Sequence, residues 1–162
     1  MTTITQDLER IVSQEKSLVF SHFDNATAWI LGASIHEMCT AKKVSVAIEI
    51  RLSCETVFFH AMSGTSPANA DWARRKRNTV ELLHRSSYGV GLSFQIEGGS
   101  LEESMGLPLR DYASHGGSFP IQVIGMGNVG VVTVSGLPQR KDHAIVVMAL
   151  SQMCGAAIVE LD

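Results

Sequence analysis

The sequence predicts an α+β fold in which an antiparallel sheet is flanked by helices. Two strand hairpins are separated by helical segments, and further helical segments lie near both ends of the chain. Elements in this order typically form a sheet covered by helices. A chain of 162 residues, with 45% hydrophobic and 18% charged residues, has the size and composition of one globular domain over residues 1–162.

Two helices are expected before the first hairpin. Residues 4–15 place apolar side chains three and four positions apart, and Thr3 can cap the first turn. A second helix with the same spacing starts at Asp24 or Asn25 and runs through Met38. Both helices therefore have one apolar face available for the core.

The first hairpin is predicted from strict alternation. Apolar and polar residues alternate over 44–52, which indicates a half-exposed strand. A turn at 53–55 leads into a second strand over 56–62. A helix over 69–84 follows after a loop.

The second hairpin joins a strand over 121–126 to one over 129–135. Gly127 and Asn128 form the expected turn, because both tolerate positive φ. Residues 125–130 match GxGxxG as letters, but a dinucleotide-binding fingerprint must open a helix, and here a strand follows. A β-turn explains these glycines.

Two further segments complete the chain. Residues 100–118 are rich in glycine and too long for a simple connector, and such loops are often functional. A final helix begins near Pro138. Its predicted apolar face consists of Ile145, Met148, Ala149, Gln152 and Met153.

Composition and charge exclude several classes of function. A net charge of −3 argues against a nucleic-acid partner. The first residues carry acids and amides where a secretory signal needs basic and apolar ones, so we expect a cytoplasmic protein. The longest apolar stretch, in the last helix, is interrupted by His143, Ser151 and Gln152, so we expect no membrane span.

The cysteines and histidines give no metal pattern. The three cysteines lack CxxC spacing and are interpreted as small buried apolar residues. The six histidines form no HxH, HxxxH or HExxH motif. We therefore expect neither a metal site nor a disulfide framework.

The helix over 69–84 and the residue after it carry the densest polar cluster. One face presents Arg74, Arg77, Asn78, Glu81 and Arg85, with Trp72 on the other side. This face is either solvated, with Arg77–Glu81 and Glu81–Arg85 ion pairs, or it forms an anion pocket. Charged helix faces are usually only solvated. Guanidinium groups would suit a pocket because they bind carboxylates and phosphates through two hydrogen bonds.

The diglycine at Gly116 and Gly117 is the second candidate feature. Without Cβ atoms, its backbone can be approached closely by a ligand or by a neighbouring segment. His115 precedes it in a loop and is the strongest candidate among the histidines. His36 and His60 are interpreted as structural. Ser86 to Tyr88 can cap a helix end. The sequence contains no GxSxG elbow, so no motif indicates a serine nucleophile.

Five segments together resemble the GlcG/HbpS-like haem-degrading-domain family, in its uncharacterised branch. They are Asp71-Trp72, RRKRN at 74–78, HRSSY at 84–88, HGGSFPI at 115–121 and VGVVTVSGL at 129–137. The resemblance implies a profilin-like or PAS-like topology, a homo-oligomer, and haem as a compatible ligand. It also implies a helix over 86–97, where alternation of apolar residues alone would favour a strand.

Three hypotheses for function follow. The first is an oligomeric protein that binds haem or a small anionic ligand through Trp72, Arg74, Arg77, Tyr88, His115, Gly116 and Gly117. The second is an enzyme that degrades haem or modifies a small acid, with His115 or Tyr88 as proton donor. The third is a scaffold that recognises other proteins.

Overall fold

A computed structural model describes residues 3–161 and confirms the predicted α+β class. The elements, in chain order, are α1 (Ile4–Ser17), β1 (Val19–Phe20), α2 (Asn25–Ala41), β2 (Ala47–Leu52), β3 (Glu55–Ala61), α3 (Pro67–Leu83), α4 (Ser87–Glu97), α5 (Leu101–Met105), β4 (Ser118–Val123), β5 (Gly127–Ser135) and α6 (Gln139–Cys154). The strands form one sheet in the order β1-β4-β5-β2-β3. All neighbours are antiparallel except β1, which runs parallel to β4.

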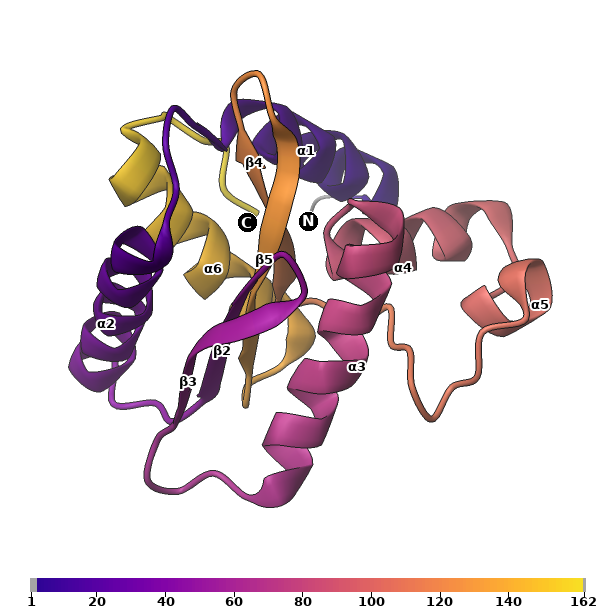
Figure 1. Cartoon of the computed structure of the whole chain (residues 1–162). Helices are drawn as coiled ribbons and strands as arrows, with labels where there is room; N and C mark the ends of the chain where they lie inside the picture. Colours follow the sequence, from indigo (N-terminus) through magenta and orange to yellow (C-terminus); the bar gives the residue numbers. More distant parts are fainter. Residues whose placement is uncertain (1–2, 162) are drawn as a thin grey trace.

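Helices cover both faces of the sheet, as Figure 1 shows. Helices α2 and α6 pack together on one face, and α3 contacts the other face along β2, β4 and β5. Helix α1 packs against α4, while α5 lies away from the sheet (Figure 1). The end of the chain returns to α1, where Gln14 Nε2 donates to the carbonyl oxygen of Val159 at 2.8 Å.

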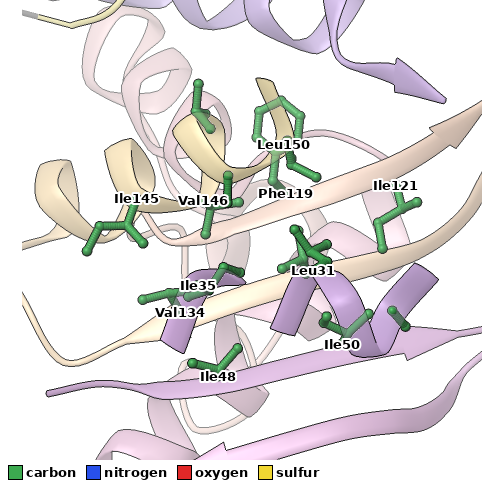
Figure 2. Packing of buried hydrophobic residues seen from close by; sticks show 14 of the residues in the cluster. Leu31, Ile35, Ile48, Ile50, Phe119, Ile121, Val134, Ile145, Val146 and Leu150 are labelled. Carbon is green, nitrogen blue, oxygen red and sulfur yellow. The ribbon is translucent and has the colours of Figure 1, made fainter. Parts of the chain in front are cut away.

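The main core lies between the sheet and the α2–α6 layer. Figure 2 shows Leu31 and Ile35 of α2 and Ile145, Val146 and Leu150 of α6 packed over the strands. Each of these residues is buried. A buried aliphatic side chain of this size contributes roughly 1.5–3 kcal/mol, so this layer supplies much of the stability.

Capping side chains set where the first two helices begin, as predicted. Thr3 caps α1 and exchanges hydrogen bonds with Gln6, and Asp24 does the same for α2 with Thr27. Each reciprocal pair satisfies two backbone N–H groups at the helix start. Helix α3 starts two residues earlier than predicted, because Pro67 occupies its first turn behind the N-cap Ser66.

The prediction of a half-exposed first strand is wrong. Strand β2 starts at Ala47, and its polar face is covered by α3. Glu49 of this face is buried and accepts from Arg77, while Arg51 donates to Glu81 at 2.7 Å. The alternation correctly separated the two faces of the strand, but the polar face contacts a helix instead of solvent.

The turn of the second hairpin is also shifted. The loop consists of residues 124–126, and both Gly125 and Gly127 have positive φ. Asn128 belongs to β5, where its side chain accepts a hydrogen bond from the amide of Gly130. The strand that follows these glycines confirms that they do not form a dinucleotide fingerprint.

Residues 87–97 are helical, which confirms the assignment drawn from the family resemblance. Ser86 caps this helix by accepting from the amide of Gly89, so it starts α4 and does not end α3. A Cβ at Gly89 would crowd Ile11, and one at Gly91 would collide with the carbonyl oxygen of Ser114. The glycines are therefore packing sites that bring α4 close to its neighbours.

Three other expectations have mixed outcomes. Cys39 is buried as predicted, but Cys54 is exposed in the β2–β3 turn and Cys154 is half-buried. Val146 and Val147 of the last helix also lie in the core. Within residues 3–161, none of the helices combines the length and hydrophobicity needed to cross a bilayer, and no three potential ligand side chains gather around a metal position.

His143 joins α6 to α1 in the interior. Its Nε2 lies 2.9 Å from Gln14 Oε1. Because the amide nitrogen of Gln14 already donates to Val159, Oε1 is the acceptor and the imidazole carries its proton on Nε2. Nδ1 then has no hydrogen-bond partner in the described structure. Burial lowers the pKa of His143 to about 3.

We therefore predict that acid destabilises the protein through His143. An unfolded histidine takes up a proton below its ordinary pKa of about 6.5, whereas the folded one stays neutral down to about 3. The free energy of unfolding should fall across this window by on the order of 4 kcal/mol. Urea denaturation at a series of pH values should show that the free energy of unfolding falls less steeply with falling pH in His143→Gln than in the wild type. The control variant His22→Gln changes an exposed histidine and should keep the pH dependence of the wild type. The same pH dependence in all three proteins would contradict the assignment.

Candidate functional site

A polar cavity of about 260 Å³ opens beside the diglycine turn. Its walls come from α3, the turn itself, the β5–α6 connection and the first turn of α6. The lining residues are Asn69, Trp72, Lys76, His115, Gly116, Ser135, Gly136, Leu137, Gln139 and Asp142. Three segments far apart in the sequence, 69–76, 115–116 and 135–142, thus meet at one place.

Lys76 forms the inner wall of the cavity. It is 2% exposed, and its Nζ donates to the carbonyl oxygens of Gly116 at 3.1 Å and Val134 at 2.7 Å. The third acceptor is Asp142 Oδ2 at 3.2 Å. An ammonium group has three hydrogens, so its hydrogen-bonding capacity is filled by the protein itself.

Asp142 is the buried counterion. Its carboxylate also accepts from the amides of Gly136 at 3.2 Å and Leu137 at 3.0 Å. Burial raises the pKa of Asp142 and lowers the pKa of Lys76, while their mutual attraction opposes both shifts. The pair fixes the β5–α6 connection and leaves the positive end of α6 at the cavity wall.

The diglycine serves this arrangement directly. Gly117 has a φ of +126°, and a Cβ there would collide with Lys76 Nζ and the carbonyl oxygen of Val134. A Cβ at Gly116 would collide with the carbonyl oxygen of Gln139. Protein segments, and not a ligand, therefore fill the space beside these glycines.

An aromatic and cationic group lies at the mouth of the cavity. The ring centroids of Trp72 and His115 are 5.0 Å apart in an edge-to-face arrangement. The guanidinium carbon of Arg75 lies 4.2 Å from the Trp72 ring, and Arg75 also donates to the carbonyl oxygen of Leu109. Trp72 is 36% exposed, so part of its indole remains available for contact.

His115 carries a neutral imidazole at this mouth. Partial burial is the main cause that lowers its pKa, and the charges of Lys76 and Arg75 lower it further. The two cations disfavour a third positive charge nearby.

The arginines proposed for an anion pocket contact acidic side chains instead. Arg77 donates to both carboxylate oxygens of Glu49 at 3.0 Å, and Arg74 binds Asp71 and Asp111. Neither belongs to the residues that line the cavity in the described part of the chain. The alternative of a solvated face with Arg77–Glu81 and Glu81–Arg85 pairs is equally wrong, because Glu81 binds Arg51 and Arg85 donates to Ser93.

Tyr88, Gly116 and Gly117 differ in their access to the cavity. Gly116 lines it, while Gly117 lies directly behind Lys76. Tyr88 is buried, with its ring 5.3 Å from that of His143, and its hydroxyl interacts with Arg140. The structure thus brings Trp72, His115 and Gly116 together at the cavity. Tyr88 packs behind Gly116 without lining the cavity, and neither arginine lines it.

Sequence reasoning missed Lys76 and Asp142. Both carry a usable signal. Lys76 lies four residues after Trp72 and four before Val80, so it falls on the apolar face of its helix. Asp142 precedes Ile145 and Val146 on the buried face of α6. A lone charge on an apolar helix face needs a buried counterion, and these two residues satisfy each other.

The sequence of this chain matches a family model and several known proteins. A model of the family described as "Haem degrading protein HbpS-like" matches residues 23–151. A UPF0303 protein of Serratia proteamaculans is 46% identical over 155 residues, which is 96% of each chain. A UPF0303 protein of Paraburkholderia phymatum is 51% identical over 152 residues, covering 94% of this chain and 92% of the relative.

Solved structures share the fold. The crystal structure of the Ybr137w protein has a TM-score of 0.84 and 28% identity, covering 91% of this chain and 87% of the other. The crystal structure of HbpS has a TM-score of 0.65 and 16% identity, with coverages of 82% and 89%. That of a PduOC:haem complex has a TM-score of 0.69 and 16% identity, with coverages of 88% and 100%.

Crowding around Gly117 gives a sharp test of the site geometry. We predict that Gly117→Ala destabilises the protein much more than Gly125→Ala. Both glycines have positive φ, which costs an alanine about 1 kcal/mol, but Gly125 has open space where a Cβ would lie. Chemical denaturation should therefore show an additional loss of about 1–3 kcal/mol at Gly117. Equal losses would mean that Lys76 and β5 do not press against the turn.

Proposed function

Because the chain belongs to the HbpS-like haem-degrading protein family, we propose that it binds a small molecule, and that the cavity beside His115 takes a small anionic ligand. The family match covers residues 23–151 and thus all the residues that line this cavity. The proposal for the anion rests on this chain's own residues.

The supporting observation is that His115 lies beside two cationic side chains. Lys76 lines the same cavity, and Arg75 stacks on Trp72, whose ring contacts that of His115. Burial is the main cause that lowers the pKa of His115, and the charges of Lys76 and Arg75 lower it further. The first turn of α6 borders the same space through Gln139, and the amide groups at a helix start attract anions. In the described structure no side chain caps this helix.

The size and walls of the cavity restrict the ligand class. A volume of about 260 Å³ lies just below the roughly 300–1,000 Å³ of typical cofactor pockets. The indole of Trp72 offers a flat apolar surface next to the polar wall. We therefore propose a small carboxylic acid whose carboxylate lies near His115 and whose apolar part contacts Trp72.

We predict saturable binding of a small carboxylate at a single site. Calorimetric titration with acetate, succinate and benzoate should detect at least one ligand, and Trp72→Ala and His115→Ala should each weaken it about tenfold, or about 1.4 kcal/mol. An anion next to His115 favours the imidazolium. Affinity should therefore rise as the pH falls through the lowered pKa of His115.

His22→Ala is the matched control, because His22 is an exposed histidine that makes its hydrogen bond with Asp24. It should leave both the affinity and its pH dependence unchanged. The proposal fails if all three acids show no heat of binding. It also fails if His22→Ala removes the pH dependence that we assign to His115.

Haem is the second candidate ligand, and the accessible neutral imidazole of His115 favours it. Histidine is a common axial ligand of haem iron, and it binds in its neutral form. The interior of the cavity is too small for the macrocycle. Haem would therefore contact His115 at the mouth, with the exposed edge of Trp72 beside it.

We predict that, if haem is the ligand, its Soret band shifts on titration and that His115→Ala abolishes the shift. His60→Ala is the control, because His60 lies beside a different hollow next to His36. Loss of the shift in His60→Ala with retention in His115→Ala would contradict a haem contact at the cavity mouth.

Of the two proton donors considered for the enzymatic alternative, only His115 lines the cavity. His115 reaches the mouth, whereas Tyr88 is buried behind Gly116 against His143. A proton transfer to a bound acid would thus depend on His115. The binding proposal requires no such step and accounts for the same residues.

A further inference from the structure

One polar side chain of the cavity has no partner in the protein. Ser135, the last residue of β5, is 3% exposed and lines the cavity, and its hydroxyl makes no hydrogen bond within residues 3–161. Among these residues only His143 Nδ1 is both unpartnered and completely covered. The Ser135 hydroxyl is therefore reached from the open space of the cavity. A hydroxyl in such a position takes its partner from solvent or from a ligand.

The preceding hydroxyl on the same face of β5 is satisfied by the protein. Thr133 lies two residues before Ser135, so both side chains point to the same side of the sheet. The Thr133 hydroxyl lies 2.7 Å from the hydroxyl of Ser118, and both of these residues are buried. The missing partner at Ser135 is therefore a local property of the cavity wall.

Two amide side chains add further donors to this wall. Asn69 Oδ1 accepts from the backbone amide of Ser66 at 2.9 Å, and Gln139 Oε1 accepts from that of Gly116 at 3.2 Å. These bonds identify the oxygen of each amide and leave its NH₂ group without an acceptor in the described chain. Asn69 and Gln139 both line the cavity with Ser135. The cavity thus offers three donor groups that the protein does not satisfy.

The charges around these donors favour a neutral acceptor. Lys76 and Asp142 are the charged residues that line the cavity in the described chain, and they form an ion pair at 3.2 Å. Lys76 Nζ has three protein acceptors, so it has no hydrogen left for a ligand. Unbalanced positive charge comes from Arg75, which stacks on Trp72 at the mouth. An anionic group is therefore favoured at the mouth, and a neutral polar group is favoured beside Ser135.

We propose that the ligand is a short carboxylic acid with a second, neutral carbonyl group, whose oxygen accepts a hydrogen bond from the Ser135 hydroxyl. This inference rests on the function proposed above, because it takes the carboxylate of the same ligand to lie near His115. A carbonyl oxygen has two lone pairs and no hydrogen, so it suits a wall that offers donors. The amide of Asn69 or Gln139 supplies the second hydrogen bond. Ser135 is then the residue that determines specificity for the carbonyl.

Selection for the carbonyl follows from the cost of leaving the donors unpaired. An acid that carries a methylene in place of the carbonyl would displace water from the Ser135 hydroxyl without offering an acceptor. A site that hydrogen-bonds its ligand rejects analogues that lack the bonding group for this reason. The carbonyl acid should therefore bind more tightly than its methylene analogue.

Calorimetric titration with a matched pair of acids tests the inference. Levulinate and pentanoate share one carbon chain and differ only by a carbonyl in place of a methylene. The wild type should bind levulinate more tightly than pentanoate by roughly tenfold or more. Ser135→Ala should reduce the affinity for levulinate to that for pentanoate, without weakening pentanoate. The control variant Ser104→Ala changes an exposed serine of α5 and should keep the preference of the wild type.

The stability of the unliganded variants gives an independent readout. Ser135→Ala removes a hydroxyl that has no protein partner, so the urea midpoint of the unliganded protein should not fall. Ser118→Ala removes a buried hydroxyl that is bonded to Thr133, so its midpoint should fall. A fall in Ser135→Ala as large as that in Ser118→Ala would show that the protein itself satisfies the Ser135 hydroxyl, and would overturn the inference.

The titrations also separate this inference from the function on which it rests. Equal affinity of the wild type for levulinate and pentanoate, with both lost in His115→Ala, would overturn the carbonyl contact and keep the anion site. Equal weakening of both acids by Ser135→Ala would overturn the carbonyl contact too. Tighter binding of succinate than of levulinate would overturn the preference for a neutral group. No binding of levulinate would overturn the inference, and no binding of any acid would overturn the proposed function with it.

Discussion

The buried ion pair between Lys76 and Asp142 organises the region around the cavity. Through it, α3 is tied to the diglycine turn, to the end of β5 and to the start of α6. Each of these segments supplies a wall of the cavity. Burying two charges is costly unless every hydrogen-bonding group is satisfied. Here the ammonium has three acceptors, and the carboxylate accepts from two backbone amides as well.

This arrangement links folding to the chemistry of the site. The glycines at 116 and 117 are required because Lys76 and neighbouring backbone occupy the space of their side chains. Partial burial lowers the pKa of His115 at the mouth, and the charges of Lys76 and Arg75 lower it further. The positions of Lys76 and of the charges near His115 are therefore consequences of how α3 docks on the sheet. Trp72 and His115 remain accessible at the mouth of the cavity.

Much of the fold follows from residue spacing, whereas the site follows only in part. Periodicity places α1, α2, α3, α6 and the two hairpins, and Thr3 and Asp24 mark two helix starts. Over α4, however, periodicity alone favours a strand. Trp72 and Gly116, both named from the sequence, line the cavity. The partners of the charged residues are not local, however. Arg77 binds Glu49 across 28 positions, and Lys76 binds Asp142 across 66. Only the packing of α3 on the sheet reveals these pairs.

We propose that the cavity between α3, the diglycine turn and α6 is the ligand site. Chemical-shift mapping of ¹⁵N-labelled protein during titration with succinate tests it most directly. We predict saturable shifts at the Trp72 indole and at the amides of Gly116, Leu137 and Gln139, with α2 and β3 unchanged. Shifts confined to α2 and β3, or no saturable shift at any of these four positions, would contradict it.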